Sequence, residues 1–315
     1  MEKENSTIRV SEFVLLGLSQ SPEHQRFLFV IFLFIYLATW LGNLTIIITV
    51  ICDYHLHTPM YFFMANLALM EVSESSITAP KFLQTLLSQH KSISYNSCLI
   101  QIFCIHFIGA SVIFILVVMA ADRYLAIHKP LQYMTIMNWN MCLKIMVIAW
   151  TAAFLHGITV MSVVIQLPFC GPNILDNFYC DIPQVVQLAC TDTSTVELFI
   201  ITNNGLIITV VFTGLLISYT VILLKIRNHL SKGKHKAVST CVAQITVVSL
   251  HLISCSFVYD RPFQKFAEDK FVSVIYTMIS PVLNPIIYTL RNTEMKSAIR
   301  RLAGKVFFSH RGSKM

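Results

Sequence analysis

The sequence predicts an all-α membrane protein, a bundle of seven transmembrane helices followed by a short amphipathic helix. The 315-residue chain is 55% hydrophobic and only 12% charged, whereas a soluble domain carries about 25% charged residues. Its apolar residues gather in seven runs, each long enough to cross the ~30 Å hydrocarbon core of a bilayer. The net charge of +7 reflects basic loops on one side of that bilayer and contact with anionic lipid, and it does not indicate nucleic-acid binding.

Charged residues and proline delimit the seven runs. We expect helices over about 27–52, 59–80, 96–128, 141–167, 198–224, 237–259 and 271–291. Residues 1–26 precede this seven-helix domain of residues 27–292, and they lack the apolar core of a cleavable signal peptide. The tail, residues 293–315, carries an apolar helical face that we expect to lie on the inner membrane surface; this face comprises Met295, Ile299, Leu302 and Val306.

Basic residues are concentrated in two segments on the same side of the predicted bundle. They fall between the fifth and sixth runs and after the seventh, which places these segments and the C-terminus in the cytoplasm. The N-terminus, with a glycosylation sequon at Asn5, is then extracellular. Four cysteines share that outer face, where disulfides persist, and their spacing matches no common zinc site; they are Cys98, Cys170, Cys180 and Cys190.

Short motifs in most of the runs carry a resemblance to a known family. They are Gly42-Asn43, Leu56–Phe63, Met119–Tyr124, Ser218-Tyr219, Lys236–Cys241 and Pro281–Tyr288, together with Phe178–Asp181 in the cysteine-rich loop. With them the chain resembles a rhodopsin-like G-protein-coupled receptor over nearly its whole length, and within that class an odorant receptor of the land-vertebrate type. The resemblance implies a plasma-membrane receptor without a cofactor, and not an enzyme. Such a receptor binds a small volatile ligand and activates a stimulatory, olfactory-type heterotrimeric G protein, which raises cAMP.

The Asp122-Arg123 pair ends the third run at the inner membrane edge. A buried carboxylate beside an arginine favours mutual pairing, which would restrain the arginine in the resting state. The resemblance implies that activation frees Arg123 toward the G protein. The alternative is a helix end that these charges merely anchor. The resemblance also assigns to the switch Tyr124, Tyr219, Asn284, Pro285 and Tyr288.

Two glutamates, Glu71 and Glu74, lie inside the second run, where ionisable groups suggest a functional site. The resemblance places Glu71 at an acidic sodium site with Asn43 and Asn284. The alternative is that each glutamate is protonated and hydrogen-bonded within the bundle.

The resemblance further implies how the outer cysteines pair. Cys98–Cys180 would tie the third helix to the long loop, and Cys170–Cys190 would close a ring within that loop. Both bridges would hold the loop as a lid over the mouth of the bundle. A catalytic thiol is not expected, because no activating base is placed beside any cysteine.

One face of the third run is small and apolar with a single histidine, and we expect it to line a pocket with the outer halves of the fifth, sixth and seventh runs. Such walls suit a small, weakly polar volatile molecule. The outer half of the third run carries no carboxylate, so an amine anchored as in aminergic receptors is not expected. The histidine, His106, could equally be a packing residue. The expected ligand contacts are Ile105, His106, Gly109, Ala110, Ile113, Asn203, Asn204, Ile207, His251, Leu252, Cys255, Tyr259, Val274, Thr277 and Met278.

Three positions depart from the family pattern. Ala121 precedes Asp122 where a tyrosine is usual, Leu252 occupies the place of an aromatic residue in the sixth run, and Asp260-Arg261 suggests an ion pair where that run ends. A receptor for a non-odorant metabolite outside the nose stays an alternative. A transporter or channel would show repeats or paired broken helices, and an enzyme would need a clustered catalytic set; neither pattern is apparent.

Overall fold

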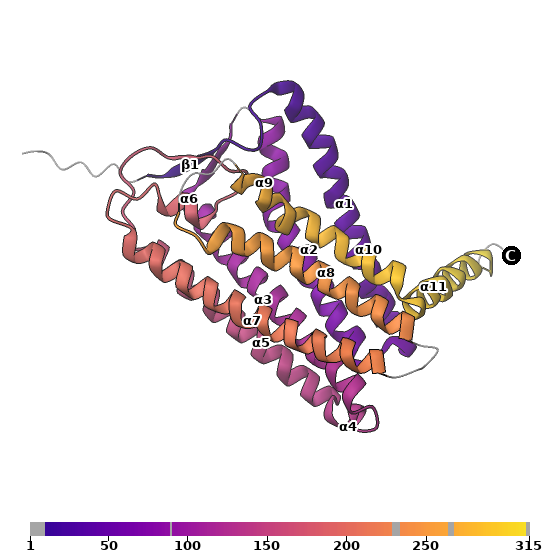
Figure 1. Cartoon of the computed structure of the whole chain (residues 1–315). Coiled ribbons are helices and arrows are strands. Elements are labelled where there is room, and N and C mark those ends of the chain that lie inside the picture. The colour runs from indigo at the N-terminus through magenta and orange to yellow at the C-terminus, as the bar shows by residue number, and fades with distance from the viewer. Residues whose placement is uncertain (1–9, 89, 229–233, 264–267, 313–315) are drawn as a thin grey trace, which may run out of the picture.

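The computed structural model describes residues 10–88, 90–228, 234–263 and 268–312 (Figure 1). The Asn5 sequon lies outside the described residues, and so do the side chains of Cys241, Tyr288 and Val306. Seven long helical segments run side by side and make up the bundle, which confirms the expected fold class. They are α1 (Pro22–Cys52), α2 (Pro59–Leu87), α3 (Tyr95–His128), α5 (Trp139–Val164), α7 (Ser194–Asn228), α8 (Lys234–Tyr259) and a seventh segment built from α9 (Asp269–Val274), the π-helical turn η2 (Ile275–Ile279) and α10 (Ser280–Arg291).

Among the described residues, five of these segments are long and apolar enough to cross a membrane, namely α1, α3, α5, α7 and the seventh segment. In α8 the described apolar stretch is shorter, Val248–Tyr259. The helix α2 carries Glu71 and Glu74 and buries both of them against its neighbours. Both glutamates therefore face protein, as intramembrane charges generally do.

Several helices extend beyond the apolar runs from which they were predicted. The first begins at Pro22, a residue suited to the first turn, and is followed by Glu23 at the positive end of the helix dipole. The second continues through Pro80 to Leu87. An apolar run marks the part of a helix that lies in lipid, whereas backbone hydrogen bonding continues into water, so the two boundaries differ.

A three-stranded sheet covers one end of the bundle (Figure 1). Strand β1 (Glu12–Leu15) lies in the middle, antiparallel to β2 (Ser92–Ser94) and parallel to β3 (Ile174–Leu175). Phe13 and Leu15 of β1 are fully buried beneath the long loop. Four residues of strand give too short a pattern to detect in the sequence, and their partners come from distant loops.

The opposite end carries two short elements and the tail helix. These are η1 (Tyr54–Leu56), α4 (Tyr133–Ile136) and α11 (Thr293–Gly312), which leaves the bundle at an angle in Figure 1. Met295 and Ala298 of α11 are buried against the bundle and Ile299 packs beside them. The predicted amphipathic tail helix is therefore present, and the beginning of its apolar face packs against the helix bundle.

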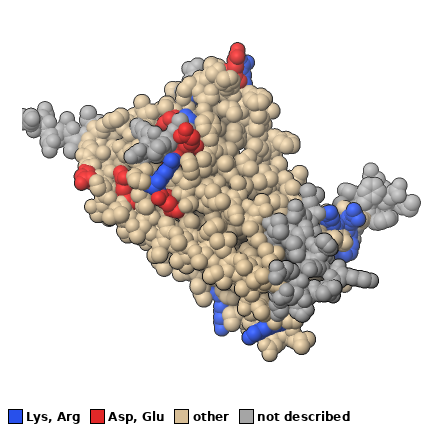
Figure 2. All heavy atoms as spheres, in the orientation of Figure 1, with Lys and Arg blue, Asp and Glu red and all other residues tan. Residues whose placement is uncertain are grey.

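Charges are sorted along the bundle. In Figure 2 a broad uncharged band separates the two ends, and on this face aspartate and glutamate appear only at the end that carries the sheet. Such a band is what a lipid-facing surface requires. Large apolar side chains are exposed along it, for example Phe34, Leu41 and Val210.

The first and seventh segments approach closely at Gly42. A Cβ placed there would lie 2.9 Å from Cγ of Pro285, so a larger residue would push α1 away from α10. The neighbouring Asn43 is buried, and its amide Nδ2 donates to the Pro281 carbonyl at 3.0 Å. This carbonyl lies one turn before Pro285, in the region where proline removes a helical donor.

Candidate functional site

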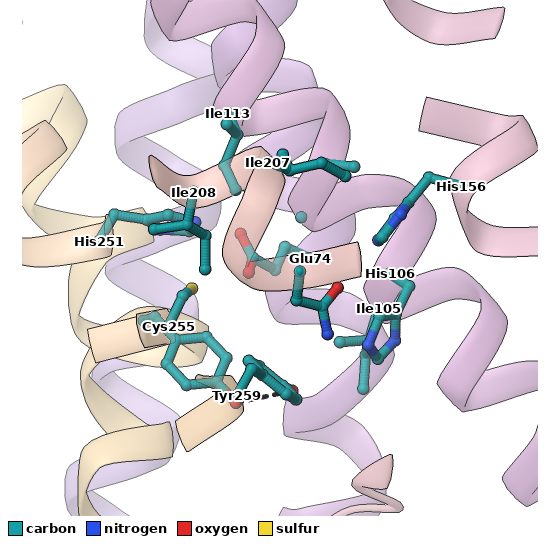
Figure 3. Close-up of a pocket in the computed structure, with 14 residues that line it drawn as sticks. Glu74, Ile105, His106, Ile113, His156, Ile207, Ile208, His251, Cys255 and Tyr259 are labelled. Atoms are coloured by element: carbon teal, nitrogen blue, oxygen red, sulfur yellow. Dashed lines mark hydrogen bonds between the residues drawn. The ribbon is translucent and has the colours of Figure 1, made fainter. Parts of the chain in front are cut away.

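A cavity of about 550 Å³, counting space that is open to solvent, lies between α3, α5, α7, α8 and η2, with one residue contributed by α2 (Figure 3). Its walls are mostly apolar, with isoleucines from α3 and α7. Polar groups interrupt the walls at a few points. The lining residues are Glu74, Ile105, His106, Gly109, Ala110, Ile113, His156, Asn204, Ile207, Ile208, His251, Cys255, Tyr259 and Tyr276.

The structure brings most of the expected contact residues together in this one cavity. All five from α3 line it, and so do residues from α7 and α8. They are Ile105, His106, Gly109, Ala110, Ile113, Asn204, Ile207, His251, Cys255 and Tyr259. The ring of His106 also lies 3.0 Å, through Nδ1, from the Ile102 carbonyl, so this histidine is a packed residue as well as a wall of the cavity.

Five expected contacts lie elsewhere. Asn203 reaches Nδ1 of His156 at 3.2 Å, and Leu252 is buried in the core. On the seventh segment Thr277 donates to the Ser273 carbonyl at 2.7 Å, while Val274 and Met278 pack beneath the long loop. The three residues expected from this segment, Val274, Thr277 and Met278, have the i, i+3, i+4 spacing of one α-helical face. The π-helical turn η2 changes the period, and Tyr276 lines the cavity instead.

Four lining residues were not among the expected contacts: Glu74, His156, Ile208 and Tyr276. Glu74 had a detectable signal, since an ionisable group inside a membrane segment suggests a functional site. The sequence could not show which neighbours α2 meets. His156 likewise stands out as a polar residue in an apolar run, and only the packing of α5 against α3 turns it toward the cavity.

The cavity contains unsatisfied polar atoms. Oε2 of Glu74, Nδ2 of Asn204 and Nε2 of His251 are buried without a hydrogen-bond partner. In Figure 3 the Glu74 carboxyl lies in the middle of the site, between His251 and Cys255 on one side and His106 and His156 on the other. Buried polar groups are normally hydrogen-bonded, so these atoms can form hydrogen bonds with a ligand that enters the cavity.

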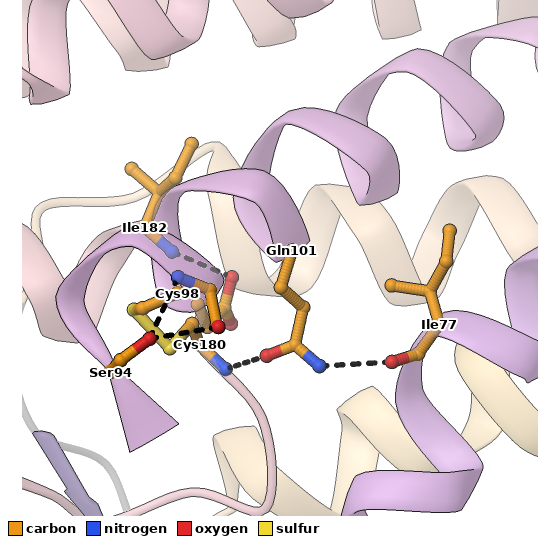
Figure 4. The surroundings of a disulfide bond; sticks show 8 residues. Ile77, Ser94, Cys98, Gln101, Cys180 and Ile182 are labelled. Carbon is orange, nitrogen blue, oxygen red and sulfur yellow. Dashed lines mark hydrogen bonds between the residues drawn. A yellow bond between two sulfur atoms is a disulfide. The ribbon is translucent and has the colours of Figure 1, made fainter.

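Both expected disulfides are present, Cys98–Cys180 and Cys170–Cys190. The first joins α3 to the long loop, where Gln101 adds two hydrogen bonds (Figure 4). Its Oε1 accepts from the Cys180 amide at 2.8 Å, and its Nε2 donates to the Ile77 carbonyl of α2 at 3.0 Å. The loop is therefore fixed to two helices at one point.

A buried polar cluster lies under the loop and beside the cavity. Tyr259 donates to Asp181 at 2.8 Å, and the hydroxyls of Tyr179 and Tyr276 lie 2.5 Å apart. Burial raises the pKa of the Asp181 carboxyl to about 6, although the hydrogen bonds from Tyr259 and Tyr179 oppose this shift. Tyr259 and Tyr276 thus connect the cavity wall to the loop above it.

Asp260 and Arg261 do not pair with each other as expected. The Arg261 guanidinium bonds to Asp269 at the start of α9, and Asp260 accepts from Ser256 one turn back in α8. Neighbouring residues at a helix end point in different directions, so adjacency in sequence does not bring the two groups together.

The same geometry corrects the expected pairing of Asp122 with Arg123. Within the described residues no ion pair joins them, and Asp122 instead accepts a hydrogen bond from the Tyr133 hydroxyl of α4 at 2.7 Å. Side chains at i and i+1 of a helix do not face each other. Nε of Arg123 is buried without a hydrogen-bond partner, and the side chain as a whole is half-buried.

The remaining switch residues occupy the same half of the bundle. Tyr124 packs against the core and its ring lies 4.5 Å from that of His128, while Tyr219 is buried. Asn284 donates through Nδ2 to Oε1 of Glu71. Pro285 forms the close contact with Gly42 described above. The structure therefore joins α2 and α10 by a direct side-chain contact.

Two of the three residues expected at a sodium site are in contact, since Nδ2 of Asn284 donates to Oε1 of Glu71. The other oxygens of this pair, Oε2 of Glu71 and Oδ1 of Asn284, are buried without a hydrogen-bond partner, and oxygen atoms are the ligands that hard cations prefer. The amide nitrogen Nδ2 of Asn43 donates hydrogen bonds to the backbone carbonyls of Thr39 and Pro281. No group of three His, Cys, Asp or Glu suited to a metal occurs in the part of the chain that the structure describes.

Two ties hold the tail helix to the bundle. Arg301 of α11 contacts Asp53 through Nε and Nη2 at 2.8 and 2.6 Å, and Tyr61 of α2 donates to Glu294 at 2.8 Å. Burial acts to raise the pKa of Asp53, but hydrogen bonds from His55 and Arg301 and the charge of Arg301 outweigh it and lower this pKa to about 2.

Comparison with known proteins places this arrangement in a family. The family model described as olfactory receptor matches residues 32–305. Human olfactory receptor 4D1 is 53% identical over 302 residues, covering 96% of this chain and 97% of its own. Human olfactory receptors 4Q3 and 4E1 are 52% and 50% identical, each with 96% of both chains covered.

Proposed function

Because the chain belongs to the olfactory receptor family, whose members are G-protein-coupled receptors and not enzymes, we propose that the cavity of Figure 3 is its odorant site. Receptors of this family are multi-pass proteins of the plasma membrane that bind small odorants and couple to G proteins. The finer assignment proposed here is a stimulatory, olfactory-type α subunit, so that a bound odorant raises cAMP.

The observation that carries the proposal is the position of the cavity. It is lined by side chains of α2, α3, α5, α7, α8 and η2, segments that run on toward the other end of the bundle. A ligand that binds differently to two packings of these helices shifts the equilibrium between them. The mostly apolar wall favours a small molecule with a hydrocarbon body.

We also propose the orientation. The end with the sheet and both disulfides faces outward, because disulfides persist in an oxidising compartment. The end with Arg123 and α11 faces the cytoplasm, and basic segments follow α7 and α10 there. The G protein would then meet Arg123, the basic segment between α7 and α8, and the start of α11.

The test is a cAMP assay in cells that carry the receptor, screened against a panel of volatile molecules. We expect Arg123→Ala to abolish the response to any active volatile at equal surface expression. Lys129→Ala, an exposed basic residue at the same helix end, is the matched control and should keep it. An intact response in the Arg123 variant would refute the coupling scheme.

A cation at Glu71 and Asn284 is a separate proposal about the resting state. A sodium ion there would bridge α2 and α10 through the free oxygens of both side chains. Glu71→Gln should therefore change basal or odorant-driven signalling and remove its dependence on external sodium. Unchanged signalling at normal surface expression would rule this role out.

A further inference from the structure

Glu74 is the one lining residue of the cavity that carries a full negative charge when ionised, and the described lining includes no lysine or arginine. Its side chain is 2% exposed and its Oε2 has no hydrogen-bond partner. The ion pairs found among the described residues involve other carboxylates, Asp53, Asp176 and Asp269. The cavity thus encloses an acidic group without a counter-ion.

A buried carboxyl in this state has two ways to lower its free energy. It can stay neutral, or it can ionise beside a cation that is desolvated with it. The other acidic group of α2, Glu71, cannot supply this positive charge. Its carboxyl already accepts a hydrogen bond from Asn284, and when ionised it would repel an ionised Glu74. A cation that pairs with an ionised Glu74 would therefore come from the ligand that occupies the cavity, since the described lining holds no lysine or arginine.

The rest of the wall is suited to a positively charged nitrogen. Nε2 of His251 is a buried atom without a partner and can accept a hydrogen bond when unprotonated. The rings of Tyr259 and Tyr276 also line the site, and aromatic faces attract cations. Ile105, Ile113 and Ile207 offer an apolar surface for a hydrocarbon body. A carboxylate ligand would meet Glu74 and find no lysine or arginine in the described lining, only the imidazoles of His106, His156 and His251.

We propose that the preferred ligands are small protonated amines, with the nitrogen bound to Glu74 and the hydrocarbon part against the isoleucines of α3 and α7. This inference rests on the proposed odorant site and names its ligand class. It also revises the expectation from the third run: the carboxylate that can hold an amine is supplied by α2. Glu74 is a specificity-determining residue in this scheme.

The test uses purified full-length receptor and three probes that share a cyclohexyl ring, cyclohexylamine, cyclohexanol and cyclohexanecarboxylic acid. Thermal stabilisation reports binding without a G protein. We expect the amine to bind most tightly and the acid least. Losing one partner of a buried charge pair costs on the order of 30-fold or more in affinity, so Glu74→Gln should weaken the amine by ~30-fold or more and leave the alcohol nearly unchanged.

Two controls separate charge from shape. Glu74→Asp keeps the charge and should retain part of the amine binding, whereas Glu23→Gln removes an exposed carboxylate at the start of α1 and should change nothing. The ranking of the three probes on the unmodified receptor needs no variant, so a misfolded Glu74→Gln protein does not end the test.

Three outcomes would overturn the inference: tighter binding of the alcohol or the acid, amine binding that is equal in Glu74→Gln, or no binding of cyclohexylamine. If the amine fails while another volatile raises cAMP, the odorant-receptor function stands and only the ligand class is wrong. If the amine binds as expected and no cAMP response follows, the ligand class stands and the proposed coupling fails.

Discussion

The two ends of the helix bundle are held together in different ways. The end with the sheet has two disulfides, three paired strands and a buried cluster around Asp181. The end with α11 depends on separate side-chain contacts, including Tyr133 with Asp122 and Arg301 with Asp53. The first end is cross-linked, whereas each contact at the second end can be exchanged for another.

This difference fits a receptor in which one end binds and the other responds. Covalent links and buried hydrogen bonds keep the cavity wall and its loop in one arrangement. Single hydrogen bonds and partly exposed ion pairs contribute little energy each, so a change in helix packing can replace them. The described structure has Asp122 bound to Tyr133 and Nε of Arg123 without a partner.

The largest expected effect comes from the disulfide that joins the loop to α3. Its cysteines are 82 residues apart, against 20 for the bridge within the loop. Loop-closure entropy then predicts a loss of roughly 4.5 kcal/mol for Cys98→Ser/Cys180→Ser and roughly 3 kcal/mol for Cys170→Ser/Cys190→Ser. Thermal unfolding and surface expression of the two double variants measure the difference. Equal losses would show that bridge span does not govern stability here.

The next effect is a pH dependence from Asp181. Its folded-state pKa is raised from 3.8 to about 6, so the folded protein binds the proton more tightly than the unfolded chain. Its contribution to stability is full below pH ~4 and is lost as pH rises through about 6, on the order of 3 kcal/mol in all. The melting temperature should fall between pH 5 and pH 7.5.

The Asp181→Asn variant should lack this part of the pH dependence. Asp176→Asn is the matched control, because Asp176 lies in the same loop but its side chain is 48% exposed and pairs with Lys270. If the pH dependence of unfolding survives in Asp181→Asn, another group is responsible and the buried carboxyl of Asp181 is not the source.

A smaller effect is expected where α4 contacts α3. Tyr133→Phe removes the hydrogen bond to Asp122 while keeping the ring, which costs about 1.5 kcal/mol for a bond to a charged acceptor. We expect higher basal cAMP, since this contact holds the described arrangement. Tyr54→Phe, an exposed tyrosine at the same end, should leave the basal signal unchanged. Lower basal signalling in Tyr133→Phe would contradict the assigned role.

The smallest effect is expected at the tie between α11 and η1. Arg301→Met removes the partner of Asp53, whose pKa is lowered to about 2. A carboxyl group whose pKa is lowered in the folded state stabilises the fold. This stabilisation is complete above pH ~4 and is lost as the pH falls toward 2. The unfolding temperature of Arg301→Met should therefore lie slightly below that of the parent at pH 6, with the gap narrowing at pH 3. Arg300→Met, exposed on the same helix, should show no such gap.

Sequence patterns predicted the bundle well because membrane helices are governed by local rules. Long apolar runs, flanking charges and Pro59 at the start of α2 depend on neighbouring residues alone. The face of α3 was also predictable, and all five of its expected residues line the cavity. A helix face follows from periodicity once the helix is regular.

The expectations failed where regularity or local sequence was not enough. With the π-helical turn, Tyr276 lines the cavity where Thr277 was expected, and strand β1 forms from an N-terminal segment for which no strand was predicted. Two pairs of adjacent charges, Asp122 with Arg123 and Asp260 with Arg261, were wrongly expected to pair. Adjacency along a helix separates side chains around its axis.

The amino-acid sequence by itself determined which helices this chain forms and which motifs lie at their ends, because lipid imposes length and polarity on each helix separately. Those motifs carried the resemblance to the olfactory receptors, which the family model confirms. Only the tertiary structure decided which side chains from different helices meet. It set Glu74 of α2 in the cavity built mainly from α3, α7 and α8, and it gave Asp122 the partner Tyr133. Contacts between helices depend on how each one is turned and tilted against its neighbours, and no spacing within a single helix specifies that.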